Sequence, residues 1–351
     1  MSGHSLVAYT PAAGWATFVL FAWARRHFKA LGPSTRHSGS ATRPAREPGG
    51  AARTEGRVTI GGRTVAYTSA GAGKPLLLVH GLGGTRQTWN GIVDALAETH
   101  HVIAPDLPGH GDSDPPAGDF SLGAFAVVLR DLLISLDFRS ATIIGHSLGG
   151  GIAMQFGYQF PERTDRLVLI SSGGLGPQVS PMLRAATLPG AETVVAVLAR
   201  SPEAVTRRFL SFASRVMPGS LARPDIGPVA EDLHRLTDAG QRRTFVRTAS
   251  NVIDWRGQSI SAIGSLAQLT DLPILLAWGT DDRTIPPHHH RAVSLMLTCP
   301  RLLEIPGAGH YPHISAPDQL VPALRDFLET TKPFRYTEAR WRQLLRAAVR
   351  R

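Results

Sequence analysis

Short apolar runs alternate with longer segments of helical periodicity along the chain from Gly56 onward. The runs are bounded by glycine, proline and polar residues, which predicts buried strands. The predicted strands are residues 58–60, 65–69, 76–80, 102–105, 142–145, 167–171, 274–278 and 302–305. The predicted helices between them are residues 92–98, 122–136, 148–160, 288–296 and 317–329. This alternation is typical of βαβ units, so we expect an α/β fold: a mostly parallel eight-stranded sheet with helices on both faces.

The alternation stops between residues 173 and 268. Stretches such as PEAVTRRFLSFASRV have helical periodicity there, and no convincing strand is present. Structureless loops of that length are rare. We therefore expect a helical lid, residues 173–268, inserted between two parts of a core, residues 56–172 and 269–330.

The N-terminal extension, residues 1–55, is basic and partly apolar. Its apolar span at residues 6–24 approaches the roughly 20 residues of a membrane helix. No basic region precedes the span and no clear cleavage site follows it, so it is a poor secretory signal. The extension could be a membrane anchor with its arginines on the cytoplasmic side, a disordered segment, or a start assigned too far upstream. We expect a cytoplasmic protein, with membrane association through this segment as the alternative.

The C-terminal segment, residues 331–351, predicts a basic amphipathic helix with Trp341, Leu344 and Leu345 on its apolar face. Such a helix could lie on an anionic membrane surface, or it could dock on its own domain with a solvated basic face.

The net charge of +10 is carried by the two ends of the chain. Residues 1–55 hold seven basic and two acidic residues, and residues 331–351 hold seven and one. Residues 56–330 then hold 23 basic and 24 acidic residues, so the predicted core is close to neutral. This distribution argues against a nucleic-acid partner.

Metal and cofactor signals are weak. The single cysteine, Cys299, excludes an internal disulfide and leaves no Cys/His zinc pattern. Three consecutive histidines at 288–290 would point in different directions on a helix and chelate poorly. The glycine-rich stretch after residue 80 lacks the Lys-Ser/Thr of a phosphate loop. We expect no metal and no cofactor.

The stretch GHSLG, residues 145–149, matches G-x-S-x-G directly after a predicted strand and before a predicted helix. In that context the glycines allow a strained turn that exposes the serine hydroxyl. We therefore predict Ser147 as a nucleophile.

A serine hydroxyl needs a base, which in turn needs a carboxylate to orient it. On this scaffold the partners follow in the order serine, acid, histidine, each after a later strand. Asp282 in GTDDRTIP is the candidate acid and His310 in PGAGHYPH the candidate base. Asp281 and, less directly, Asp106 are alternatives for the acid.

The turn HGLGGT, residues 80–85, also follows a predicted strand. Its backbone amides could stabilise charge on a substrate oxygen. We predict an oxyanion hole formed by the N–H groups of Leu82 and Leu148, the latter at a helix N-terminus.

These motifs, with APDLPGHGDSD at residues 104–114, resemble the lidded serine-hydrolase branch of the α/β-hydrolase superfamily over residues 56–328. The chain is also similar to uncharacterised actinobacterial hydrolases with AMQFGYQFPE-like and DWRGQ-like stretches. The resemblance implies that Ser147 is the nucleophile, Asp282 the acid and His310 the base. Family members that open epoxides or cleave carbon–halogen bonds have an aspartate in place of Ser147, which argues against both reactions.

The resulting hypothesis is an esterase or lipase-like serine hydrolase that acts on a small-molecule ester with an apolar acyl group. A hydrolase of carbon–carbon bonds in ring-cleavage products, a thioesterase, an acyltransferase and a non-catalytic binding protein remain alternatives. His146, Trp255 and Tyr311 are candidates for the substrate pocket. His146 and His80 are expected to hydrogen-bond within their loops, and His313 to make a surface or lid contact.

Overall fold

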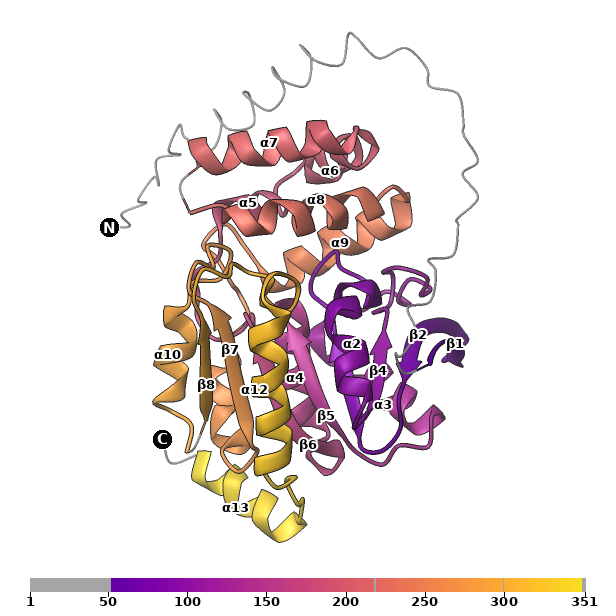
Figure 1. Cartoon of the computed structure of the whole chain (residues 1–351), viewed down its shortest axis with the longest axis vertical. Helices are drawn as coiled ribbons and strands as arrows, with labels where there is room; N and C mark the ends of the chain where they lie inside the picture. The colour runs from indigo at the N-terminus through magenta and orange to yellow at the C-terminus, as the bar shows by residue number, and fades with distance from the viewer. Residues whose placement is uncertain (1–51, 218, 299, 349–351) are drawn as a thin grey trace, which may run out of the picture. The chain divides into compact units, whose positions relative to one another are not determined.

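A computed structural model describes residues 52–217, 219–298 and 300–348. One eight-stranded sheet runs through this part of the chain, with the order β1-β2-β4-β3-β5-β6-β7-β8 (Figure 1). Its strands are β1 (Arg53–Ile60), β2 (Arg63–Ala70), β3 (Pro75–Val79), β4 (His101–Pro105), β5 (Ala141–His146), β6 (Thr164–Ile170), β7 (Ile274–Gly279) and β8 (Arg301–Ile305). The predicted strands are all present, and β1 begins three residues before the predicted start of the core.

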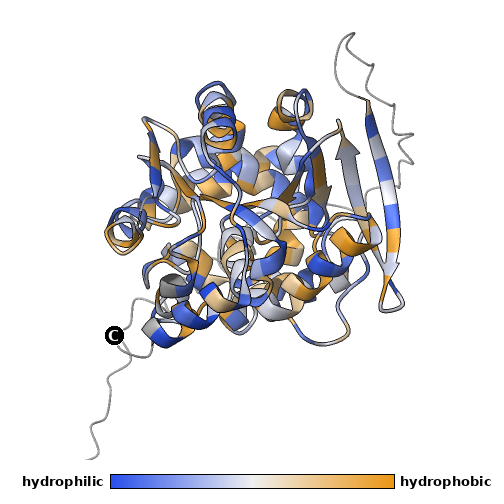
Figure 2. Ribbon diagram, turned by 90° about the horizontal axis from the view of Figure 1, so that it is seen from below, coloured by the Kyte–Doolittle hydropathy of each residue, from blue (hydrophilic) through white to orange (hydrophobic). Residues whose placement is uncertain are grey.

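Only the first two strands depart from parallel pairing. β1 pairs antiparallel with β2, and β2 pairs antiparallel with β4, whereas β4 through β8 are all paired in parallel. β1 lies at the edge of the sheet, and much of its length consists of hydrophilic residues (Figure 2). β5 and β7 are buried at every residue, as expected for central strands covered on both faces.

Helices cover both faces of the sheet, and each face has its own apolar cluster. One cluster joins α3 (Leu122–Ser135), α4 (Leu148–Gln159) and α10 (His288–Ser294) to the strands. The other joins α2 (Asn90–Ala97) and α12 (Pro317–Thr330) to the opposite face. The predicted α/β fold is therefore confirmed.

A helical insertion separates β6 from β7. It contains α5 (Pro181–Ala185), α6 (Ala191–Arg200), α7 (Glu203–Val216), the short 3₁₀ helix η3 (Arg223–Asp225), α8 (Ile226–Arg235), α9 (Ala239–Val252) and η4 (Ile263–Leu269). In Figure 1, α5 to α9 stand beyond one end of the strands. Three further short helical segments are η1 (Arg86–Trp89), η2 (Pro161–Arg163) and α11 (Pro312–Ser315).

The C-terminal helix α13 (Glu338–Ala348) docks on its own domain. It packs against η4, and Leu344 is buried while Leu345 is 41% exposed. Arg340 pairs with Asp271 at the edge of this contact. Within the described residues, no helix is long and apolar enough to span a membrane. The predicted N-terminal span at residues 6–24 and Cys299 lie outside the described residues.

Candidate active site

The serine of the GHSLG turn adopts a backbone conformation that few residues tolerate. Ser147 joins β5 to α4 with φ 54° and ψ −116°, in the region that side-chain-bearing residues rarely occupy. A Cβ on Gly145 would lie 2.2 Å from the carbonyl oxygen of Gly149, and one on Gly149 would lie 2.1 Å from that of Val79. The flanking glycines are therefore required by space, because backbone packs directly on both sides of the turn.

Ser147, His310 and Asp282 meet at the carboxyl end of the sheet. The Ser147 hydroxyl lies 3.0 Å from Nε2 of His310, and Nδ1 of His310 lies 2.9 Å from Oδ2 of Asp282. Oδ1 of Asp282 accepts hydrogen bonds from the backbone N–H groups of Thr284 and Ile285, both at 2.9 Å. Oδ2 therefore remains to accept the Nδ1–H of His310, which leaves Nε2 free to accept the serine proton.

The electrostatic surroundings favour a proton on His310. Burial is the largest single influence and lowers the pKa of His310, but the charge and hydrogen bond of Asp282 and the charges of Asp225 and Asp232 together outweigh it. The net effect raises the pKa of His310 above its usual value. A histidine in this setting can stabilise the imidazolium that forms when it takes a proton from a hydroxyl.

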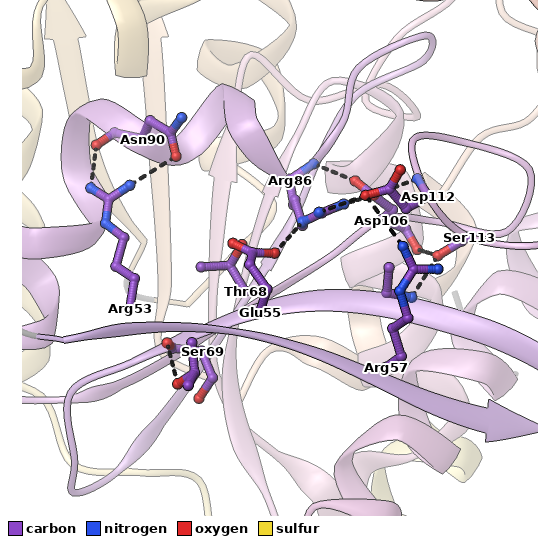
Figure 3. A network of polar contacts seen from close by, with 12 residues as sticks. Arg53, Glu55, Arg57, Thr68, Ser69, Arg86, Asn90, Asp106, Asp112 and Ser113 are labelled. Atoms are coloured by element: carbon purple, nitrogen blue, oxygen red, sulfur yellow. Dashed lines mark hydrogen bonds and ion pairs between the residues drawn. The ribbon is translucent and has the colours of Figure 1, made fainter. Parts of the chain in front are cut away.

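The two alternative acids lie elsewhere. Asp281 is exposed, and its carboxylate accepts a hydrogen bond from the hydroxyl of the neighbouring Thr280. Asp106 is fully buried and pairs with Arg86, which also reaches Asp112 (Figure 3). Asp106 thus belongs to an ion-pair network beside β1, and His310 contacts neither alternative acid.

The predicted oxyanion turn lies against the serine. A Cβ on Gly81 would come within 3.2 Å of the Ser147 Cβ, so the backbones of the two turns approach closely. Leu82 and Leu148 both line the cavity into which Ser147 opens. Both residues thus border the same cavity as the hydroxyl, and an oxyanion hole formed by their backbone amides stays a prediction.

The empty space of that cavity is about 480 Å³ when the part open to solvent is included. The insertion between β6 and β7 contributes eight of the fourteen described lining residues. The described lining residues of the cavity are Leu82, Leu122, Ser147, Leu148, Gly151, Gly173, Gly174, Val179, Leu183, Val252, Ile253, Gln258, Ile260 and Ile285. Apart from Ser147 and Gln258 these are apolar residues or glycines, and none of them carries a charge.

The residues predicted to line the pocket lie outside this lining. His146 is buried, and its Nε2–H donates to the carbonyl oxygen of His310 at 2.7 Å. Tyr311 is buried, and its hydroxyl donates to Asp232 at 3.1 Å. Trp255 is 68% exposed, with the guanidinium of Arg256 over its ring. Sequence reasoning missed instead the aliphatic side chains of the insertion, which carry no motif.

Several histidines around the site are buried and neutral. Burial lowers the pKa of His80 to about 4 and those of His110 and His313 to about 3. Nδ1 of His80 donates to the carbonyl of Gly81 while Nε2 accepts the N–H of Leu107. His313 is fully buried against Trp89. The sequence had predicted a surface or lid contact for this histidine instead.

These histidines predict acid sensitivity. Histidine in an unfolded chain has a pKa near 6.5. Below that pH the unfolded chain therefore binds protons at His80, His110 and His313, whereas the folded chain keeps these three rings unprotonated. Their contribution to stability is complete above pH 6.5 and is lost as the pH falls toward 4, at about 1.4 kcal/mol per pH unit for each histidine. Burial raises the pKa of Asp225 and of Asp232 to about 6, so both bind protons in the fold and offset part of the loss.

We therefore expect the melting temperature to be lower at pH 5.5 than at pH 7.5, by roughly 5 °C. The difference should shrink in His313→Gln, which removes one buried titrating group. It should persist in His288→Gln, because His288 is exposed. An equal or higher melting temperature at pH 5.5 would show that these rings are not held neutral.

The three consecutive histidines contact two partners, and Nε2 of His288 lies 3.4 Å from Oε1 of Gln178, which His289 also contacts. Nε2 of His289 lies 2.6 Å from Oε1 of Gln178, and Nε2 of His290 lies 3.0 Å from Oε1 of Glu304. Among the described residues, no group of three or more potential ligands comes together to hold a metal ion.

The comparisons with known proteins agree on the family. The family model of the alpha/beta hydrolase fold matches residues 74–317. An uncharacterised protein of Mycobacterium tuberculosis is 38% identical over 292 residues, which cover 82% of this chain and 85% of that protein.

Two solved structures have the same fold. One is a 2-hydroxy-6-oxo-6-phenylhexa-2,4-dienoate hydrolase from Rhodococcus, with a TM-score of 0.65 and 20% identity over 80% of this chain and 99% of that one. The other is a membrane phospholipase A described as a bacterial virulence factor, with a TM-score of 0.64 and 23% identity over 91% of this chain and 94% of that one. The chain belongs to the alpha/beta hydrolase fold family.

Proposed function

We propose that the protein is a serine hydrolase that cleaves carboxylic esters through an acyl-enzyme intermediate. The observation that carries the proposal is the chain of contacts from the Ser147 hydroxyl through His310 to Asp282, at the floor of an apolar cavity. A hydroxyl within hydrogen-bonding reach of an oriented imidazole is the arrangement needed for nucleophilic attack.

In the proposed mechanism, Nε2 of His310 takes the proton of Ser147 as Oγ attacks the ester carbonyl carbon. The backbone N–H groups of Leu82 and Leu148 stabilise the negative oxygen of the tetrahedral intermediate. His310 then gives the proton to the departing alcohol, which leaves an acyl group on Oγ. A water molecule attacks the acyl-enzyme with His310 again as base, and release of the acid restores the serine.

The lining of the cavity favours a substrate with a neutral, apolar acyl group. None of its described lining residues is charged, so an anionic group placed there would lose its hydration without gaining a cationic partner. The insertion supplies much of the wall and would act as the lid of the site. Ring-cleavage dienoates carry a carboxylate, which makes the carbon–carbon bond hydrolase the less favoured candidate.

The experiment compares p-nitrophenyl esters of two to twelve carbons with a 2-hydroxy-6-oxo-dienoate under the same conditions. We expect the esters to be turned over with kcat/KM at least 100-fold above that for the dienoate. A preference for the dienoate would contradict the proposal and indicate that the same residues catalyse cleavage of a carbon–carbon bond. Acyl-coenzyme A thioesters in the same panel test the thioesterase alternative, and an added alcohol as acyl acceptor tests acyl transfer.

Filling the cavity should shorten the accepted acyl chain. Leu183 on α5 lines the cavity, so Leu183→Trp is expected to lower kcat/KM for an octanoyl ester at least tenfold and for an acetyl ester less than threefold. Leu188 is 40% exposed and absent from the lining, so Leu188→Trp is the matched control and should change neither. An equal loss on both esters in Leu183→Trp would place the acyl group elsewhere.

A further inference from the structure

A carboxylate from the insertion reaches the backbone of the proposed catalytic histidine. Asp225 ends η3 and is fully buried. Its Oδ1 accepts a hydrogen bond from the N–H of His310 at 2.8 Å and a longer one from the N–H of Tyr311 at 3.4 Å. The contact joins residues 85 positions apart in the sequence. It therefore fixes the insertion to the loop after β8 that carries His310, which we call the histidine loop.

Asp225 makes this contact instead of capping its own helix. It occupies the N-cap position of α8, where an aspartate ordinarily accepts a hydrogen bond from the first turn. No such side-chain bond is present at this cap. Asp238, the N-cap of α9 in the same insertion, does accept from Gly240 and Gln241. The helix begun by Asp225 therefore forgoes a stabilising side-chain cap.

The histidine loop is shaped to receive this carboxylate. A Cβ on Gly309 would lie 2.4 Å from both Oδ1 and Oδ2 of Asp225. The φ of Gly309 is not in the left-handed region, so its backbone conformation does not demand glycine. Gly309 is required because Asp225 occupies the space that a side chain would fill.

The His310 backbone is held on its other side as well. Its carbonyl oxygen accepts the Nε2–H of His146, the residue next to Ser147, at 2.7 Å. Asp232, two turns after Asp225 along α8, accepts the hydroxyl hydrogen of Tyr311. The peptide groups on both sides of the His310 Cα thus have fixed partners, which restricts the direction of the imidazole.

We propose that Asp225 is a positioning residue for His310: its carboxylate anchors the His310 main chain from the insertion and places a second negative charge beside the imidazole. This inference rests on the proposed role of His310 as general base. It predicts that the insertion contributes to catalysis as well as to the wall of the cavity.

The charges around His310 give the proposal an electrostatic consequence. Asp282, Asp225 and Asp232 are the carboxylates that raise its pKa. The rings of His146 in β5 and of Tyr311 contact the imidazole, and the ring of His313 in α11 contacts both of those rings. Burial keeps the pKa of His146 and of His313 below the usual value. Loss of one carboxylate should therefore lower the pKa of His310 and move the acid limb of kcat/KM to lower pH.

Asp225 itself faces His310, Asp282 and Tyr311, and burial raises its pKa to about 6. Its Oδ2 has no hydrogen-bond partner among the described residues. A buried carboxylate that is only partly satisfied costs stability, which is a common feature of residues retained for a functional site.

Two variants separate the charge from the anchor. Asp225→Asn keeps an oxygen that can accept the His310 N–H but removes the charge, so the acid limb of kcat/KM should shift to lower pH with a modest loss at the plateau. Asp225→Ala removes both, so kcat should fall about 100-fold because the imidazole is no longer held in place. KM should stay within threefold, since Asp225 does not line the cavity.

The measurements are pH profiles of p-nitrophenyl ester hydrolysis and the rate at which a fluorophosphonate labels Ser147. Asp238→Ala is the control: it loses a helix cap in the same insertion and should leave both readouts unchanged. Wild-type pH profiles and labelling rates in both Asp225 variants would overturn the inference and leave the proposed function standing. Absence of labelling at Ser147 in the wild-type protein would overturn the proposed function, and the inference with it.

Discussion

Replacement of Ser147 by alanine is expected to lower kcat for ester hydrolysis about 10⁶-fold. The reason is that Oγ is the atom proposed to carry the acyl group, and no other described hydroxyl contacts His310. Alanine has the same Cβ as serine, so the strained backbone at φ 54° is no harder to adopt and the melting temperature should be nearly unchanged. Initial rates on a p-nitrophenyl ester, with unfolding monitored by circular dichroism, check both points.

Ser135→Ala is the control for this substitution. Ser135 lies on the exposed side of α3, where its hydroxyl donates to the carbonyl of Asp131. Its activity should equal that of the wild-type protein. If Ser147→Ala kept more than a small percentage of the activity, hydrolysis would have to use another nucleophile or direct attack by water.

Asp282→Asn is expected to lower kcat about 10⁴-fold. The hydrogen bonds of Asp282 explain this expected loss. Oδ1 of Asp282 accepts two backbone N–H groups, so the amide oxygen of asparagine must take that place and its NH₂ must face His310. His310 would then present a lone pair at Nδ1 and a proton at Nε2, directed at Ser147. In that tautomer it cannot take the serine proton.

The neighbouring acid provides the matched control. Asp281→Asn alters an exposed side chain that does not contact His310, so kcat should stay within about twofold of wild type. Measurement of kcat for both variants on one ester tests the assignment of the acid. A large loss in Asp281→Asn with little change in Asp282→Asn would reverse the assignment of the acid.

The sheet and the meeting of Ser147, His310 and Asp282 could be predicted because each depends on local signals. A short apolar run predicts a strand, and parallel strands bring their carboxyl ends to one edge of the sheet. Residues in the loops after β5, β7 and β8 must then lie near each other. The order of serine, acid and histidine along the chain was sufficient to choose them.

The contribution of the insertion could not be predicted in the same way. Asp225 stands at a helix start, where its sequence context predicts a cap, and only the packing of α8 against the histidine loop turns its carboxylate toward His310. The position of Trp255 could not be predicted for a related reason. A large aromatic side chain in the insertion suggests substrate contact, but whether it lines the cavity or is exposed is set by tertiary packing.

Trapping of the acyl-enzyme tests the proposed mechanism most directly. The protein is mixed with a slowly hydrolysed p-nitrophenyl ester, quenched in acid within milliseconds, digested and analysed by mass spectrometry. We expect the mass of one acyl group on the peptide that contains Ser147, and none on that peptide in Ser147→Ala. Ester turnover without any acyl group on Ser147, or with the acyl group on another residue, would contradict the mechanism.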